Sequence, residues 1–159
     1  MNRNIQTACL LAVAAASLTF AIAADDEGAN LPEGPGKELV AKVCIDCHSA
    51  ATFRKMRMNE DQWTDKVGDM VDRGAKADDK QQAEIVAYLV QNFGKGAKVY
   101  INTAPDTELI VVLGFTVEES KALVEYRAGH GGFQQWSDVA KVPGVDARKV
   151  EAQKEKIAF

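Results

Sequence analysis

Two similar stretches, residues 108–116 and 138–146, lie 30 positions apart in the last third of this 159-residue chain. Each predicts a short helix, a tight turn around a glycine and a longer helix. The longer helix begins at a capping residue, Thr116 in the first copy and Asp146 in the second. A chain with this repeat is expected to fold into two helical hairpins that pack on each other.

The preceding segment, residues 36–96, has the hydrophobic period of helices and no alternating strand pattern. Asn59 and Asp79 are each followed three positions later by a glutamine, which is the pattern of a capping box at a helix start. We therefore expect an all-α fold with two domains, a helical domain at 36–96 and a tandem helix-hairpin-helix domain at 97–159. The helical domain is so small that a bound cofactor would help to complete its core.

The N-terminal segment, residues 1–24, carries a single charged side chain, Arg3, followed by an apolar run that ends in an Ala-x-Ala pattern. This is typical of a secretory signal peptide, the alternative being a retained membrane anchor. Residues 25–35 are acidic and contain glycine and proline, and we expect a linker there. The prediction is a periplasmic protein without stable membrane insertion after signal cleavage.

Cys44, Cys47 and His48 form the motif C-x-x-C-H. Two thiols about one helical turn apart can add to the two vinyl groups of a haem, and the next residue then presents an imidazole to the iron. A thioredoxin-like motif would need alternating strands and helices nearby, and a structural zinc site would need two further ligands. The motif therefore predicts one covalent haem c, held by Cys44 and Cys47 and ligated by His48.

A second iron ligand is expected among Met56, Met58, Met70 and His130. Met56 and Met58 follow His48 so closely that little chain remains to reach the opposite face of the macrocycle. Met70 is therefore the predicted ligand, and a methionine sulfur would close the iron to outside molecules. The alternative is that Met70 is an ordinary core residue.

The segment 36–94 resembles class I cytochrome c domains in the glycine Gly36, the haem motif and a last helix that contains Tyr88. The stretch W-x-x-x-V-x-x-M-V-x-R-G-A at 63–75 further resembles cytochromes that serve periplasmic dehydrogenases, where its methionine is the distal ligand. In that family the first and last helices cross at the glycine and the aromatic residue. No proline occurs between His48 and Gly94, so the usual support of the proximal ring is missing.

The segment 101–157 resembles paired helix-hairpin-helix domains of the competence DNA-receptor type. The matching stretches are I-N-T-A, L-x-x-L-G-F, Y-R-x-x-x-G-G-F and S-D-V-x-x-V-P-G-V. DNA-binding members present backbone amides to a phosphate, usually through a second glycine. That position holds Thr116 in one hairpin and Asp146 in the other, and a carboxylate there would repel a phosphate.

The whole chain has 19 basic and 23 acidic residues and therefore no general attraction for nucleic acid. We accordingly expect an exported electron carrier, not an enzyme, whose hairpins dock a periplasmic redox partner, for example a dehydrogenase, and bind no nucleic acid. Two alternatives stay open. One is a haem sensor or peroxidase-like enzyme with an open distal site. The other is a DNA-binding helix-hairpin-helix protein.

Overall fold

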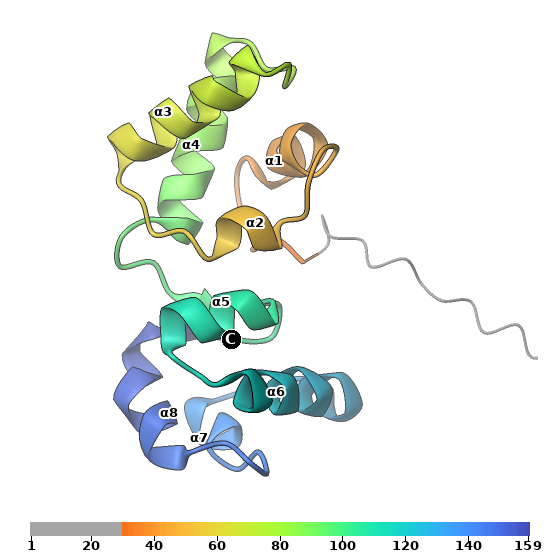
Figure 1. The fold of residues 1–159 in the computed structure, drawn as a ribbon, viewed down its shortest axis with the longest axis vertical. Helices are drawn as coiled ribbons and strands as arrows, with labels where there is room; N and C mark the ends of the chain where they lie inside the picture. Colours follow the sequence, from red (N-terminus) through yellow and green to blue (C-terminus); the bar gives the residue numbers. More distant parts are fainter. Residues whose placement is uncertain (1–29) are drawn as a thin grey trace, which may run out of the picture.

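The computed structural model describes residues 30–159, so the predicted signal peptide and residues 25–29 of the predicted linker lie outside the described residues. The described chain is mostly helical, as predicted (Figure 1). Its α-helices are α1 (Lys37–Cys44), α2 (Ala51–Arg54), α3 (Glu60–Asp72), α4 (Asp79–Phe93), α5 (Asp106–Leu113), α6 (Val117–His130), α7 (Trp136–Val139) and α8 (Ala147–Gln153). A single 3-10 turn (Lys154–Lys156) and two short strands, β1 (Val99–Tyr100) and β2 (Ile157–Ala158), complete the elements of this part.

The N-terminal part, residues 30–94, has its own hydrophobic core. Helix α4 supplies much of it and packs against both α1 and α3. The buried side chains come from all four helices and from Leu31 and Ala50, which lie outside them. They are Leu31, Val40, Ala50, Phe53, Trp63, Val67, Ile85, Val86, Tyr88, Leu89 and Phe93. Burial of this apolar surface holds the three longer helices together.

Helices α1 and α4 approach closely at Gly36, as the sequence predicts. Gly36 has φ +90°, and a Cβ atom placed on it would lie 2.9 Å from the Cβ of Tyr88 and 3.2 Å from the carbonyl oxygen of Glu84. Glycine is required here for two reasons, because the backbone is left-handed and because there is no room for a side chain.

Helix starts follow the capping predictions with one correction. Asn59 caps α3, with its side chain accepting from the Gln62 amide while the Gln62 side chain accepts from the Asn59 amide. At α4 the same exchange joins Asp78 and Gln81. The prediction that Asp79 is the cap is therefore wrong by one residue. Helix α2 was not predicted, because it is a single turn without a side-chain cap.

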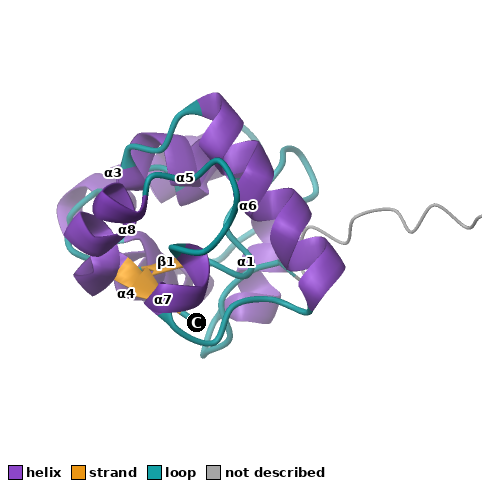
Figure 2. Ribbon diagram, turned by 90° about the horizontal axis from the view of Figure 1, so that it is seen from below, coloured by secondary structure: helices purple, strands orange, loops and turns teal. Residues whose placement is uncertain are grey.

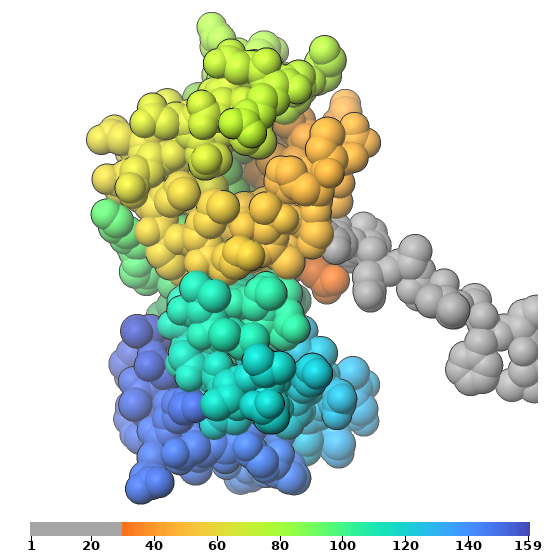
Figure 3. Space-filling model, in the orientation of Figure 1, coloured from red at the N-terminus to blue at the C-terminus, as the bar shows by residue number. Residues whose placement is uncertain are grey.

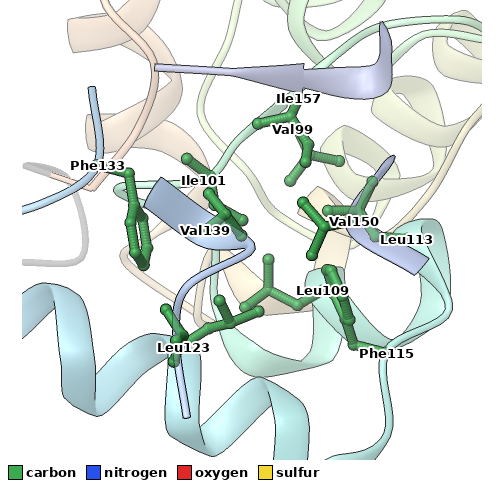
Figure 4. Packing of buried hydrophobic residues seen from close by; sticks show 12 residues of the cluster. Val99, Ile101, Leu109, Leu113, Phe115, Leu123, Phe133, Val139, Val150 and Ile157 are labelled. Atoms are coloured by element: carbon green, nitrogen blue, oxygen red, sulfur yellow. The ribbon is translucent and has the colours of Figure 1, made fainter. Parts of the chain in front are cut away.

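The C-terminal part, residues 97–159, encloses a second core (Figure 4). Helix α5 packs against α6, and α7 packs against α8 (Figure 2). The buried side chains come from both strands and from every helix of this part. They are Val99, Ile101, Ala104, Leu109, Leu113, Phe115, Leu123, Phe133, Val139, Val142, Val150 and Ile157. Two helical hairpins therefore share one core, as the repeat predicts.

The two strands were not predicted, and they pair in parallel at the two ends of this part. Val99 lies opposite Ile157, and Tyr100 lies opposite Ala158. Both Val99 and Ile157 are buried in the core. The pair is too short to give an alternating pattern in the sequence, so hydrophobic periodicity could not show it.

The two parts meet where α2 lies against α5 (Figures 1 and 3). Glu108 of α5 is 1% exposed and accepts hydrogen bonds from Arg54 Nε and Arg57 Nη2, each at 2.8 Å. Arg54 is equally buried and also donates to the Asn30 carbonyl and to Thr103 Oγ1. We call these three charged residues the Glu108 network, which joins the two parts through buried ion pairs.

Two residues of the predicted linker, Leu31 and Pro32, are buried against the N-terminal part. Leu31 is 2% exposed, and the Pro32 carbonyl accepts a hydrogen bond of 2.7 Å from the Tyr88 hydroxyl. These two residues of the segment therefore contribute to the packing of the N-terminal part. None of the helices between residues 30 and 159 is both long and apolar enough to cross a membrane.

Candidate functional site

The first hairpin consists of α5, a turn at Gly114 and α6, and its turn amides are used internally. Gly114 has φ +72° and donates its amide to the Ile110 carbonyl. Thr116 caps α6 by accepting from the Glu119 amide, while its own amide donates to the Glu119 carboxylate. The first turn of α6 also carries Glu118. This hairpin is therefore closed and acidic, which makes it a poor phosphate site.

The second hairpin consists of α7, a turn at Gly144 and α8, and it is more open. Gly144 has φ +86°, and a Cβ atom built on it would meet nothing within 4 Å. Its amide has no hydrogen-bond partner among residues 30–159. A left-handed glycine with a free amide is thus presented at the surface.

Two cationic side chains flank this turn. Lys141 precedes it with a side chain that is 70% exposed and lies 3.4 Å from the Asp138 carboxylate, and Arg148 follows it with a side chain that is 95% exposed. Arg148 Nε lies 3.5 Å from the Asp146 carboxylate, which also caps α8 by accepting from the Arg148 amide. That hydrogen bond and the guanidinium lower the pKa of Asp146 below its ordinary value. The carboxylate predicted to repel a phosphate is therefore partly compensated by its own neighbour.

Glu119 of the first hairpin holds the second hairpin in place. Its carboxylate accepts from the Thr116 amide on its own hairpin, and from the Asp146 amide and Lys149 Nζ on the other. Burial disfavours the charged form, but the hydrogen bonds from Lys149, Thr116 and Asp146 outweigh it and lower the pKa of Glu119. The sequence predicts Thr116 as the cap of this helix, but it does not predict the reach of Glu119 across to the second hairpin.

This arrangement predicts an acid sensitivity that a single substitution should reduce. A carboxylate with a lowered pKa in the folded state stabilises the protein above its unfolded-state pKa, and this contribution is lost as the pH falls. Wild-type stability should therefore decline more steeply than that of Glu119→Gln below the ordinary glutamate pKa of 4.5. Urea unfolding at a series of pH values measures both slopes, and parallel curves would contradict the prediction.

The predicted haem residues occupy the end of α1 and the turn after it. Cys44 is the last residue of α1, whereas Cys47 and His48 follow it. Both thiols are free, and burial raises the pKa of Cys44 to about 11, so this thiol is protonated at neutral pH. The His48 ring packs edge-on against Phe53 at 6.3 Å, and its Nδ1 is buried without a partner among the described residues.

The predicted distal residues lie elsewhere. Met70 is half-buried near the end of α3. Met56 and Met58, which were set aside as ligands, pack against the N-terminal core. His130 ends α6 in the other part, where its ring stacks on Tyr126 at 3.9 Å. The structure thus brings Cys44, Cys47 and His48 into one turn and places Met70 on a separate helix.

Two hairpins around one core define the C-terminal part as a paired helix-hairpin-helix fold. Residues 94–158 match the family of the helix-hairpin-helix motif. ComE operon protein 1 of Bacillus subtilis (strain 168) is 39% identical over 64 residues, which are 40% of this chain and 31% of that protein. Endonuclease/exonuclease/phosphatase family domain-containing protein 1 of Homo sapiens is 42% identical over 57 residues, 36% of this chain and 10% of that protein.

The chain spans less than a third of the length of these relatives. No solved structure matches the chain. The matched regions fall on the C-terminal part, and the comparisons give no support for a cytochrome c domain at residues 36–96.

These findings correct the predicted function. The match to the helix-hairpin-helix motif and the similarity to ComE operon protein 1 favour the DNA-binding alternative over a periplasmic electron carrier. They contradict the haem c cofactor, the redox partner and the expectation that nucleic acid is not bound. Within residues 30–159, no group of three or more His, Cys, Asp or Glu could hold a metal ion. The assignment of Cys44, Cys47, His48 and Met70 to one binding site stays a prediction from the sequence.

Sequence reasoning missed the cations of the second hairpin. Lys141 and Arg148 lie on either side of the turn in the sequence, and that signal was available. The prediction on nucleic-acid binding relied instead on the acidic net charge of the chain and on Asp146 as an uncompensated charge. A net charge averages over the surface and does not describe the local field at one turn.

Proposed function

We propose that this protein binds nucleic acid through the second hairpin of its C-terminal part, without catalysing a reaction. The observation that carries the proposal is the match of residues 94–158 to the helix-hairpin-helix motif. The free amide of Gly144 can donate to a phosphate oxygen, while Lys141 and Arg148 supply the charge. Contacts of this kind go to the backbone of the nucleic acid and do not read its sequence.

The first hairpin has a supporting role in this proposal. Its turn amides are already bonded, and its first helical turn carries Glu118 and Glu119. Glu119 fixes the second hairpin by bonding the Asp146 amide and Lys149. One hairpin therefore positions the other, and we expect one phosphate-contacting turn per chain.

We further propose that the protein acts outside the cytoplasm. The support is the pattern of residues 1–24, which is typical of a signal peptide. Export into the periplasm would place the hairpins where incoming or extracellular nucleic acid is met. Mass spectrometry of the N-terminus of the protein from a periplasmic fraction tests the cleavage.

Replacing both Lys141 and Arg148 with glutamine should weaken binding to duplex DNA. Each lost phosphate contact lowers the slope of log affinity against log salt by about 1, so the double variant should show a slope smaller by about 2. The expected loss is similar for unrelated sequences, because phosphate contacts carry no base information. Fluorescence anisotropy with labelled duplexes over a salt series measures affinity and slope together.

A matched control is Lys76→Gln with Lys80→Gln, which removes two exposed cations near the start of α4. This variant has the same net charge as the hairpin variant and should keep the wild-type affinity. The proposal fails if wild-type protein does not bind duplex at low salt. It also fails if the two double variants lose affinity equally, because only total charge would then matter.

A further inference from the structure

A pocket of about 380 Å³ lies at the junction of the two parts. Its lining includes Lys55 and Arg57 from the loop after α2, Lys156 from the 3-10 turn, and Val111 and Val112 from α5. Gly96 of the connecting segment lies beside them. Residues from four separated stretches of the chain thus form one hollow.

The charged side chains that line this pocket are all cationic. Three basic side chains line it and no acidic side chain does. Neither Lys55 nor Lys156 forms an ion pair among the described residues, so both charges are available to a ligand. A site with this balance favours an anion.

Arg57 gives the pocket a fixed element. Its Nη2 donates to Glu108, and its Nη1 donates to the carbonyl of Met56 at 2.9 Å, so the guanidinium is held in place. Its Nε is buried and has no hydrogen-bond partner within residues 30–159. Because Glu108 faces two arginines, the network retains one positive charge beside the pocket.

The wall that α5 contributes is apolar. The side chain of Val111 is 62% exposed, the largest fraction among the exposed large hydrophobic residues of the described chain, and Val112 lies next to it on α5. A small inorganic anion would leave this wall in contact with water. A ligand with a phosphate at one end and a flat, weakly polar body at the other would use both walls.

We propose that this pocket binds one nucleotide, with its phosphate between Lys55 and Lys156 and its base against Val111 and Val112. The choice of a nucleotide rests on the proposed function, whereas the preference for an anion with an apolar body follows from the lining itself. The nucleotide can be a free mononucleotide or an unpaired residue of a strand. In either case the ligand touches both parts of the protein.

Isothermal titration calorimetry with adenosine monophosphate, inorganic phosphate and a short single-stranded oligonucleotide tests the pocket. Lys55→Gln with Lys156→Gln should weaken nucleotide binding about tenfold, because the variant removes the two unpaired positive charges of the pocket. The control Lys76→Gln with Lys80→Gln should bind as wild type does. Val111→Ser should weaken the mononucleotide more than inorganic phosphate.

These titrations distinguish nucleotide binding in the pocket from duplex binding at the second hairpin. Binding of the mononucleotide supports a free ligand, and binding of only the oligonucleotide supports a strand. The pocket proposal falls if neither binds wild-type protein, or if both double lysine variants lose affinity equally. Lys141→Gln with Arg148→Gln should keep mononucleotide binding. If this variant loses duplex binding but still binds the mononucleotide, the pocket is a site separate from the hairpin.

Discussion

Replacing Glu108 with glutamine should lower the free energy of unfolding by about 3–5 kcal/mol. The carboxylate and the Arg54 side chain are both 1% exposed, and Arg57 is the second partner. Glutamine keeps the shape but removes the negative charge, so two largely buried guanidinium groups would face each other without compensation. Urea unfolding followed by circular dichroism at neutral pH measures the loss.

Glu118→Gln is the control for this substitution. Glu118 lies on the exposed first turn of α6 and takes no part in a buried ion pair of residues 30–159. Its replacement should change stability by less than about 0.5 kcal/mol, as is usual for surface positions. A loss at Glu108 as small as that of the control would show that the network does not stabilise the junction.

Gly36→Ala should destabilise the N-terminal part by about 2–4 kcal/mol, combining a left-handed backbone with overpacking. The new methyl group would lie 2.9 Å from the Tyr88 Cβ, so α1 and α4 would have to separate. Because both atoms are attached directly to the main chain, no side-chain rotation relieves the contact. Thermal unfolding monitored by near-ultraviolet circular dichroism reports on the packing around Tyr88.

Gly96→Ala separates the two causes. Gly96 has φ +86°, close to the +90° of Gly36, but nothing lies within 4 Å of its added Cβ. This variant should show only the backbone cost of about 1–2 kcal/mol. Equal losses in the two variants would mean that the close approach of the helices contributes nothing.

Local features of the fold were predictable because their partners lie within one helical turn. The capping boxes at Asn59 and Thr116 depend on residues three positions away, and both are present. The correction at α4 has the same origin, because Asp78 and Asp79 are each followed by a glutamine at that distance. The sequence alone offers two equal caps, and the structure uses the first, Asp78.

Features that join distant residues could not be predicted in this way. Arg54 and Glu108 are 54 positions apart, and neither carries a local signal for the other. The pocket collects residues from the loop after α2, from the connecting segment, from α5 and from the 3-10 turn, so no single window of the sequence contains it.

The prediction that the hairpins bind no nucleic acid depended on the charges around the turn at Gly144. Asp146 was treated as a bare charge at the turn, whereas its carboxylate caps α8 and pairs with Arg148. The free amide of Gly144 is a property of the turn geometry, and spacing alone does not reveal it. The resemblance to helix-hairpin-helix proteins was sound, and the expectation drawn from charge was not.

The pairing of β1 with β2 affects how the C-terminal part could be inserted into another protein. Val99 lies opposite Ile157, so the first and last elements of the C-terminal part are neighbours in space. A segment with adjacent ends can be spliced into a loop of a host without forcing the host open. In the human relative, the matching stretch is only 10% of a much longer chain. Such an arrangement is compatible with a segment that can be inserted into other proteins.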